Sequence, residues 1–241
     1  MIDLYSGTPG SGKSLHTAFN IYHRMKQGRP IICNFQIDLM KFKNKQNFTY
    51  CDNSDLTPDY LINYSREYYK NKRPKENEIL LVIDECQIMF NAREWNIKGR
   101  AEWLYFFTHH RKFGYKIILV AQFDKMIDRQ IRSLIEYEYV HRKVSNFGIK
   151  GWLLSFWSFG KLFISVKVWY PMKQKVGSEF FLARKKYYQI YDTFNTFDSK
   201  TVISEVNDRS CNEESITSVP DQQKKKGYWK FREIKQNEMV S

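Results

Sequence analysis

Residues 7–14 read Gly-Thr-Pro-Gly-Ser-Gly-Lys-Ser and match the phosphate-binding pattern G-x-x-x-x-G-K-[ST]. The glycines allow backbone conformations that a Cβ would resist, so that main-chain N–H groups can turn inward around phosphate oxygens. We expect Lys13 to reach the β- and γ-phosphates and the Ser14 hydroxyl to bind Mg²⁺. The predicted nucleotide-binding residues are Gly7, Thr8, Pro9, Gly10, Ser11, Gly12, Lys13 and Ser14.

A pair of carboxylates follows the apolar run at residues 79–83 and predicts the second half of such a site. Asp84 stands directly after the run, where a carboxylate can hold Mg²⁺ directly or through water. Glu85 follows, where a carboxylate can polarise the attacking water as general base. The Asp-Glu pair favours an ATPase in which an additional strand separates the phosphate-loop strand from the Asp-bearing strand. ATP and Mg²⁺ are therefore the expected cofactors.

Other polar residues could complete this chemistry. Gln122 ends the apolar run at residues 117–121, and at that strand end its amide could point at the γ-phosphate and act catalytically. An arginine finger would neutralise transition-state charge, with candidates Arg111, Arg129, Arg132 and Arg142. His109 and His110 do not predict a metal site, because adjacent residues of a helix point about 100° apart.

Strands alternate with helices around these residues. Residues 2–6 predict a strand, and apolar residues at helical spacing run from Leu15 to Met25 until Gly28 and Pro30 end the helix. Further strands are predicted at 30–35, 79–83, 116–121 and 137–144, and helices at 56–72, 99–113 and 126–134, with a surface excursion at 38–54. This order predicts an α/β fold: a P-loop NTPase three-layer αβα sandwich with a mostly parallel sheet.

The pattern predicts three parts: a P-loop ATPase core at 1–145, a small β-rich, aromatic appendage at 146–197, and a polar, basic, disordered C-terminal tail at 198–241. The most apolar stretch is 149–170. A membrane-spanning helix needs about 20 largely uncharged residues, whereas Lys161 and Lys167 interrupt this stretch and its end alternates like a strand. We interpret it as a β-hairpin or an interfacial aromatic patch.

Composition limits the class of partner. The chain has 241 residues, 39 Lys and Arg against 26 Asp and Glu, and a formal net charge of +13. Such an excess favours an anionic partner, either nucleic acid or a membrane surface. The four cysteines, at 33, 51, 86 and 211, have no metal-ligand spacing.

Three runs together resemble the zonular occludens toxin (Zot) family, which includes the assembly ATPases of filamentous phages. They are the loop at 7–14, the segment Leu81-Val82-Ile83-Asp84-Glu85-Cys86-Gln87, and the stretch from His109 to Gln122, continued by 128–132 and Glu136. The third run distinguishes the Zot family from other families, because many families share the phosphate loop. The resemblance covers about residues 1–145 well and 146–197 loosely.

The resemblance implies an ATPase that drives extrusion of a filamentous single-stranded DNA phage at the host inner membrane. The implied partners are phage single-stranded DNA or its coat-protein complex, other phage assembly proteins, the inner-membrane surface and further copies of the chain in a ring. The implied location is the cytoplasmic face of the inner membrane, or the cytoplasm. Two alternatives remain open at this point: a cytosolic ATP-dependent DNA-binding replication or partition factor, and a membrane adaptor with a structural nucleotide site.

Overall fold

The computed structural model describes residues 1–93, 99–144 and 162–190. All of these lie in one compact unit, Met1–Thr196. The predicted boundary near 145, the predicted tail at 198–241 and the segment 149–161 lie outside the described residues.

A single sheet runs through the described residues in the order β3-β2-β4-β5-β1-β6-β7-β8. Its pairings are parallel from β3 to β6, while β7 and β8 pair antiparallel at one edge. The strands are β1 (Ile2–Ser6), β2 (Ile31–Cys33), β3 (Phe48–Tyr50), β4 (Ile79–Ile83), β5 (Tyr115–Val120), β6 (Tyr137–Lys143), β7 (Leu162–Trp169) and β8 (Gln174–Leu182). Because β5 lies between β1 and β4, the predicted additional-strand arrangement is confirmed.

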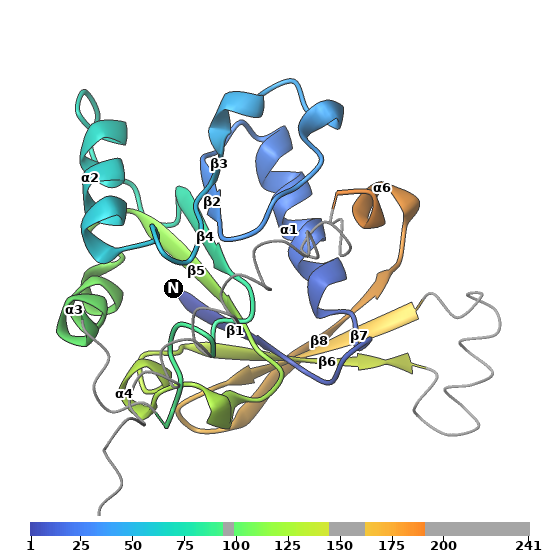
Figure 1. The fold of residues 1–241 in the computed structure, drawn as a ribbon. Coiled ribbons are helices and arrows are strands. Elements are labelled where there is room, and N and C mark those ends of the chain that lie inside the picture. The colour runs from blue at the N-terminus through green and yellow to red at the C-terminus, as the bar shows by residue number, and fades with distance from the viewer. Residues whose placement is uncertain (94–98, 145–161, 191–241) are drawn as a thin grey trace, which may run out of the picture. The chain divides into compact units, whose positions relative to one another are not determined.

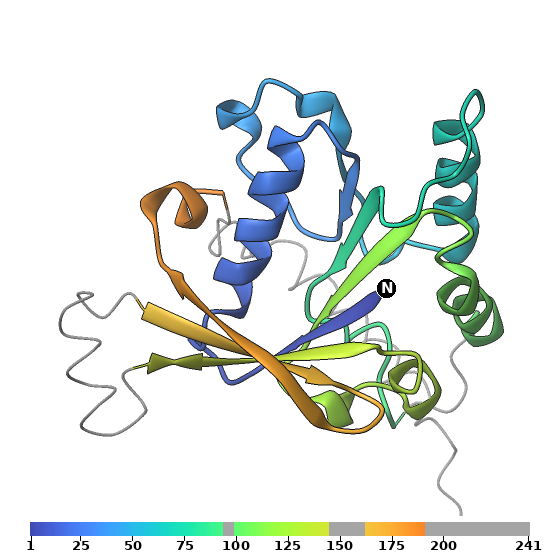
Figure 2. The same ribbon diagram turned by 180° about the vertical axis from the view of Figure 1, so that it is seen from behind.

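Helices cover both faces of this sheet, which confirms the three-layer sandwich (Figures 1 and 2). On one face α1 (Lys13–Lys26) packs Ile21 and Met25 against Tyr5, Ile31 and Val120, and α6 (Lys185–Tyr188) lies beside it. The opposite face carries α2 (Pro58–Tyr68), α3 (Arg100–His109) and α4 (Arg129–Arg132). β4 is buried along its whole length, as its uniformly apolar sequence predicts.

Two parts of the sheet refine the sequence interpretation. The Lys- and Asn-rich excursion at 38–54 contains β3, which adds an edge strand beside β2 after the short 3₁₀ helices Leu39–Lys41 and Lys45–Asn47. Of the stretch 149–170, the described part forms β7, whose antiparallel partner β8 lies beyond that stretch, and this pair extends the core sheet through β6. The segment predicted as a helix at 126–134 instead holds the end of a 3₁₀ turn, Asp124–Met126, and the short α4.

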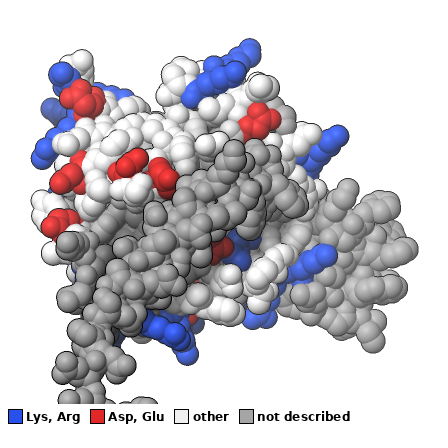
Figure 3. All heavy atoms as spheres, viewed as in Figure 1, with Lys and Arg blue, Asp and Glu red and all other residues white. Residues whose placement is uncertain are grey.

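The distribution of charged side chains and the hydropathy of the helices are relevant to the expected partners, nucleic acid and a membrane surface. Figure 3 shows Lys and Arg side chains in separate groups on the face drawn there, with Asp and Glu between them. Within the described ranges, no helix combines the length and apolar composition that crossing a bilayer requires.

Candidate functional site: a nucleotide site at the carboxyl ends of the strands

The phosphate loop connects the end of β1 to the start of α1, as its sequence requires (Figure 1). Gly12 precedes the first helical residue with φ 100°, in the left-handed region that favours glycine. A Cβ at Gly12 would lie 2.7 Å from Cδ1 of Phe163 on β7. The ring of a distant strand therefore closes one side of the loop, and no larger residue fits at Gly12.

This contact predicts the effect of Gly12→Ala. The new methyl group must displace the Phe163 ring, and the alanine backbone must keep a strained positive φ. We therefore expect a loss of about 1–3 kcal/mol in free energy of unfolding. We also expect ATP binding to be at least about tenfold weaker. Equilibrium unfolding and titration with a fluorescent ATP analogue measure both effects. Gly177→Ala on β8 is the control, because nothing lies within 4 Å of its added Cβ. Unchanged ATP affinity in Gly12→Ala would show that the loop tolerates the side chain.

Lys13 is buried at the start of α1 and points back into the loop. Its Nζ donates hydrogen bonds to the carbonyl oxygens of Gly7 at 2.6 Å and Thr8 at 3.3 Å. Burial lowers the pKa of Lys13, and the charges of Glu85 and Asp84 oppose that shift. Phosphate binding thus requires Lys13 to exchange two carbonyl partners for phosphate oxygens within the same loop.

A cavity of about 260 Å³ opens over this loop. Residues from Gly10 to Leu15 form one wall, and Phe163, Tyr187 and Tyr188 form the other. Tyr188 is 53% exposed and can contact a ligand, whereas Tyr187 is buried against α1. Sequence reasoning did not predict these aromatic residues; the signal available was only the aromatic richness of the segments that carry them.

Asp84 and Glu85 follow β4, and Asn34 at the end of the neighbouring β2 positions them. Asn34 Nδ2 donates to the main-chain oxygen of Asp84 at 2.9 Å, and Asn34 Oδ1 accepts from the Asp84 N–H at 2.7 Å. Asp84 Oδ1 accepts from the Glu85 N–H at 2.9 Å. Burial raises the pKa of Asp84 to about 6. The hydrogen bond from the Glu85 N–H opposes this shift, the charge of the Glu85 carboxylate adds to it, and the charge of Lys13 opposes it. A nearby cation would favour the ionised carboxylate.

The donor set fits a hard cation. The Ser14 hydroxyl and the Asp84 carboxylate are both oxygen ligands of the kind Mg²⁺ takes, with phosphate oxygens and water in the remaining positions. No group of three or more His, Cys, Asp and Glu capable of holding a metal occurs in the described part of the chain.

Glu85 has φ 45°, an unusual conformation for a residue with a side chain. The Cys86 N–H donates to Val120 O of β5 at 3.0 Å and fixes the chain directly after it. Gln87 Nε2 donates to Glu85 Oε2. Gln87 therefore orients the carboxylate predicted to be the general base, a role that the sequence did not indicate.

Gln122 follows β5 as predicted, and its main-chain oxygen accepts a hydrogen bond from the Gly7 N–H at 3.1 Å. Its side chain lines a second cavity, of about 430 Å³, which also contains Ser6, Thr8 and Arg142. Gln122 thus ties the end of β5 to the phosphate loop, while its catalytic role stays a prediction.

The structure separates the four arginine-finger candidates. Arg142 lines the cavity beside Gln122. Arg111 pairs with Glu136 at 2.5 Å, at the end of β1 opposite the loop, since Glu136 N–H bonds to Ile2 O. Arg132 Nη1 donates to Asp124 O at 3.4 Å, and Arg129 is an exposed residue at the start of α4.

A buried histidine pair lies behind the loop and was not predicted. His16 Nδ1 is 2.8 Å from His141 Nε2, and His141 Nδ1 is 3.1 Å from Ser6 O. Burial lowers the pKa of His16 to about 3 and that of His141 to about 4, so both rings are neutral at pH 7. The pair joins α1, β1 and β6. Its partners are 125 residues apart in sequence, which no local pattern reveals.

The chain is similar in sequence to phage proteins. The Gene 1 protein of Enterobacteria phage fd is 31% identical over 144 residues, covering 56% of this chain and 40% of that protein. The Gene 1 protein of Enterobacteria phage I2-2 is 25% identical over 209 residues, covering 83% of this chain and 56% of that protein. The chain thus spans about half the length of these curated relatives.

A solved structure shares the fold. The N-terminal domain of zonular occludens toxin from Neisseria meningitidis matches with a TM-score of 0.50 and 22% identity, over 79% of this chain and 98% of that chain. The sequence profile described as Zonular occludens toxin (Zot) matches residues 1–196. The chain therefore belongs to the Zot family.

Proposed function

We propose that this chain is an ATPase that drives assembly and extrusion of a filamentous single-stranded DNA phage at the inner membrane of its host. Lys13 binds the β- and γ-phosphates, Ser14 and Asp84 hold Mg²⁺, and Glu85 polarises the attacking water. Gln122 contacts the γ-phosphate. Bound Mg²⁺ supplies charge neutralisation on the phosphate oxygens.

The observation that carries the proposal is the meeting of both halves of the nucleotide site. The charges of Asp84 and Glu85 act on Lys13, although more than 70 residues separate them in sequence. Family membership and the phage origin of the Gene 1 relatives support the phage-assembly role.

The proposed motor is a ring of identical subunits on the cytoplasmic side of the inner membrane. Its partners are phage single-stranded DNA or the coat-protein complex, other phage assembly proteins and the membrane surface. In a ring, an arginine such as exposed Arg129 could reach a neighbouring subunit's nucleotide, while Arg142 serves its own.

Three experiments test this proposal. Purified chain should hydrolyse ATP in the presence of Mg²⁺, and host cells carrying the phage should release particles only when the chain retains hydrolysis. Membrane flotation with the other phage proteins present tests the location. A wild-type chain that neither binds nor hydrolyses ATP under oligomerising conditions would overturn the proposal.

Asn34→Ala tests how the magnesium ligand is positioned. The substitution removes two hydrogen bonds to the Asp84 main chain, so we expect about tenfold more Mg²⁺ to be needed for half-maximal hydrolysis. Magnesium titration of ATPase activity is the measurement. Asn63→Ala, an exposed asparagine on α2, is the control and should leave the titration unchanged. An unaltered magnesium requirement in Asn34→Ala would mean that Asp84 is positioned without Asn34.

A further inference from the structure

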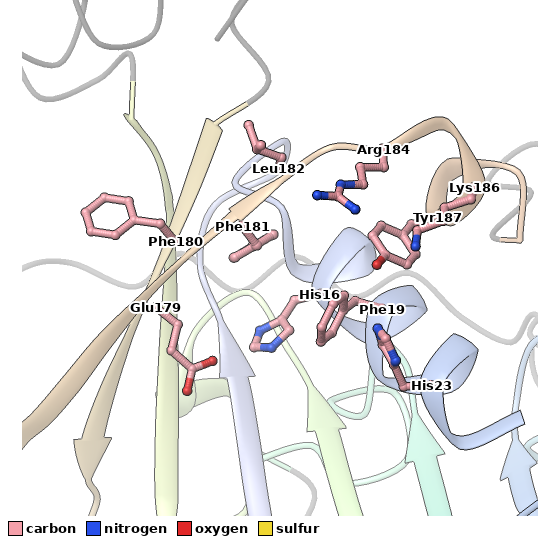
Figure 4. A pocket seen from close by; sticks show the side chains of 10 residues that line it. All are labelled: His16, Phe19, His23, Glu179, Phe180, Phe181, Leu182, Arg184, Lys186 and Tyr187. Carbon is pink, nitrogen blue, oxygen red and sulfur yellow. The ribbon is translucent and has the colours of Figure 1, made fainter. Parts of the chain in front are cut away.

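A third cavity, of about 450 Å³, lies between α1, β8 and α6 and plays no part in the proposed hydrolysis (Figure 4). Its walls include His16 and Phe19 from α1 and Phe181 from β8. Arg184 and Lys186 lie at one end of the cavity and Glu179 at the other, as Figure 4 shows. The cavity therefore has an aromatic middle, a cationic end and an acceptor end.

One buried group in this cavity has an unused hydrogen-bond acceptor. Ser6 O can only accept, so His141 Nδ1 carries a proton and its neutral Nε2 accepts from His16 Nδ1–H. The remaining nitrogen of neutral His16, Nε2, is then an acceptor, and no described residue donates to it. His16 is 6% exposed and lines the cavity, so this nitrogen requires a donor from a ligand or water.

The aromatic rings form a surface suited to a planar ligand. Phe181 lies over His16 at 5.0 Å between ring centroids and stacks on Phe163 at 5.8 Å. Phe19 meets the edge of Tyr187 at 5.3 Å. Rings arranged in this way bind nucleobases by stacking, with about 1–3 kcal/mol per base.

The charges determine the orientation of such a ligand. Neither Arg184 nor Lys186 pairs with a carboxylate of the described residues, so both can bind a phosphate. Lys186 Nζ also lies 5.0 Å from the Tyr22 ring centroid and 4.8 Å from that of Tyr187. Glu179 acts electrostatically on Tyr5 and Tyr139, which both contact the His16 ring, so its carboxylate lies near the His16 end. Glu179 and His16 Nε2 are both acceptors, and the ligand edge between them must supply donors.

We propose that this cavity binds one nucleotide of a single-stranded DNA, with the base packed against the aromatic rings and its phosphate on Arg184 and Lys186. The base edge donates to His16 Nε2 and Glu179, which favours bases with an exocyclic amino group. Thymine lacks this group and offers a single donor, N3–H, between two carbonyl oxygens, so it cannot satisfy both acceptors. Tyr187 lines both this cavity and the nucleotide cavity, so the two sites share a wall.

This inference rests on the proposed function for its choice of ligand, but its test needs no ATP hydrolysis. Binding of short fluorescent oligonucleotides to the full chain is measured by anisotropy without ATP. Arg184→Ala combined with Lys186→Ala should weaken binding at least about tenfold and reduce the salt slope by about 1 to 1.5. The control, Lys185→Ala, removes a charge from the same helix but not from the cavity, so its affinity should stay within about twofold.

Base choice provides an independent readout. Oligo-dC should bind about tenfold more tightly than oligo-dT of the same length. Glu179→Gln replaces one acceptor oxygen with a donor amide and should bring the dC-to-dT ratio close to one. Thermal unfolding of each variant confirms that it is folded.

Several results would overturn the inference. Equal losses in Lys185→Ala and in the double variant would assign binding to general surface charge. A preference for oligo-dT, or an unchanged ratio in Glu179→Gln, would contradict the base contacts. Competition by a free mononucleotide as effective as that by an oligonucleotide would make the cavity a small-molecule site. If DNA binds as proposed and hydrolysis is absent, only the proposed ATPase function fails.

Discussion

Replacing Lys13 with alanine should abolish ATP hydrolysis by this chain and greatly weaken ATP binding. Lys13 carries the one positive charge that its own loop directs at the phosphates, and its Nζ already lies within hydrogen-bond distance of Gly7 O and Thr8 O. Loss of a single preorganised donor from a site of developing charge costs about 10²–10³ in rate. The rate of ATP hydrolysis by the Lys13→Ala variant should therefore be at least about 100-fold lower than that of the unsubstituted chain.

The measurements are steady-state ATPase activity and equilibrium titration with an ATP analogue. Lys26→Ala is the matched control, because it removes the same charge from the last turn of the same helix, where the side chain is exposed. That variant should keep both activities. Hydrolysis that survives in Lys13→Ala would place the catalytic nucleotide elsewhere in the molecule.

Replacing Glu85 with glutamine should separate binding from hydrolysis. The substitution keeps the size of the side chain and its ability to pair with Gln87, so the backbone at φ 45° needs no new conformation. The amide cannot accept the proton of the attacking water, and general-base catalysis contributes about 10²–10⁴ in rate. We expect ATP affinity within about threefold of the unsubstituted chain and hydrolysis lower by at least about 100-fold.

Single-turnover hydrolysis beside ATP titration distinguishes this variant from Lys13→Ala, which loses both properties. Glu67→Gln is the control for the charge change, because Glu67 is an exposed carboxylate on α2. This variant should bind and hydrolyse ATP like the unsubstituted chain. Phage release gives a further readout in cells. Release that persists with Glu85→Gln would make the nucleotide site structural and favour an adaptor role.

Much of the nucleotide site was predictable because its residues are close in sequence. The loop at 7–14 contains the glycines that its conformation requires. Asp84 and Glu85 follow a strand whose uniformly apolar sequence indicates that it is buried. The order of β4, β5 and β1 also followed from the Asp-Glu pair, through the additional-strand arrangement it favours. These features depend on local backbone chemistry, which sequence patterns record directly.

The features that the sequence did not predict depend on contacts between segments that are distant in sequence. β3 has three residues in a Lys- and Asn-rich stretch, and only its pairing with β2 makes it a strand. Phe163 closes the loop at Gly12 across about 150 residues, and Gln87 gains its role from the conformation of Glu85. Tertiary packing determines such positions, and short-range propensity carries no information about it.

The central place of β1 has a consequence for how the chain folds as it is synthesised. β1 leaves the ribosome before the other described strands, yet its neighbours are β5 and β6, with Ile2 opposite Ile117 and Asp3 opposite Tyr137. Both edges of β1 can be paired only after more than 130 further residues have been translated, and until then its apolar residues stay exposed. Parallel pairings at such separation fold slowly and leave hydrophobic surface exposed to aggregation. A nascent chain arrested before β6 would therefore contain the whole phosphate loop and still be unable to hold it in shape.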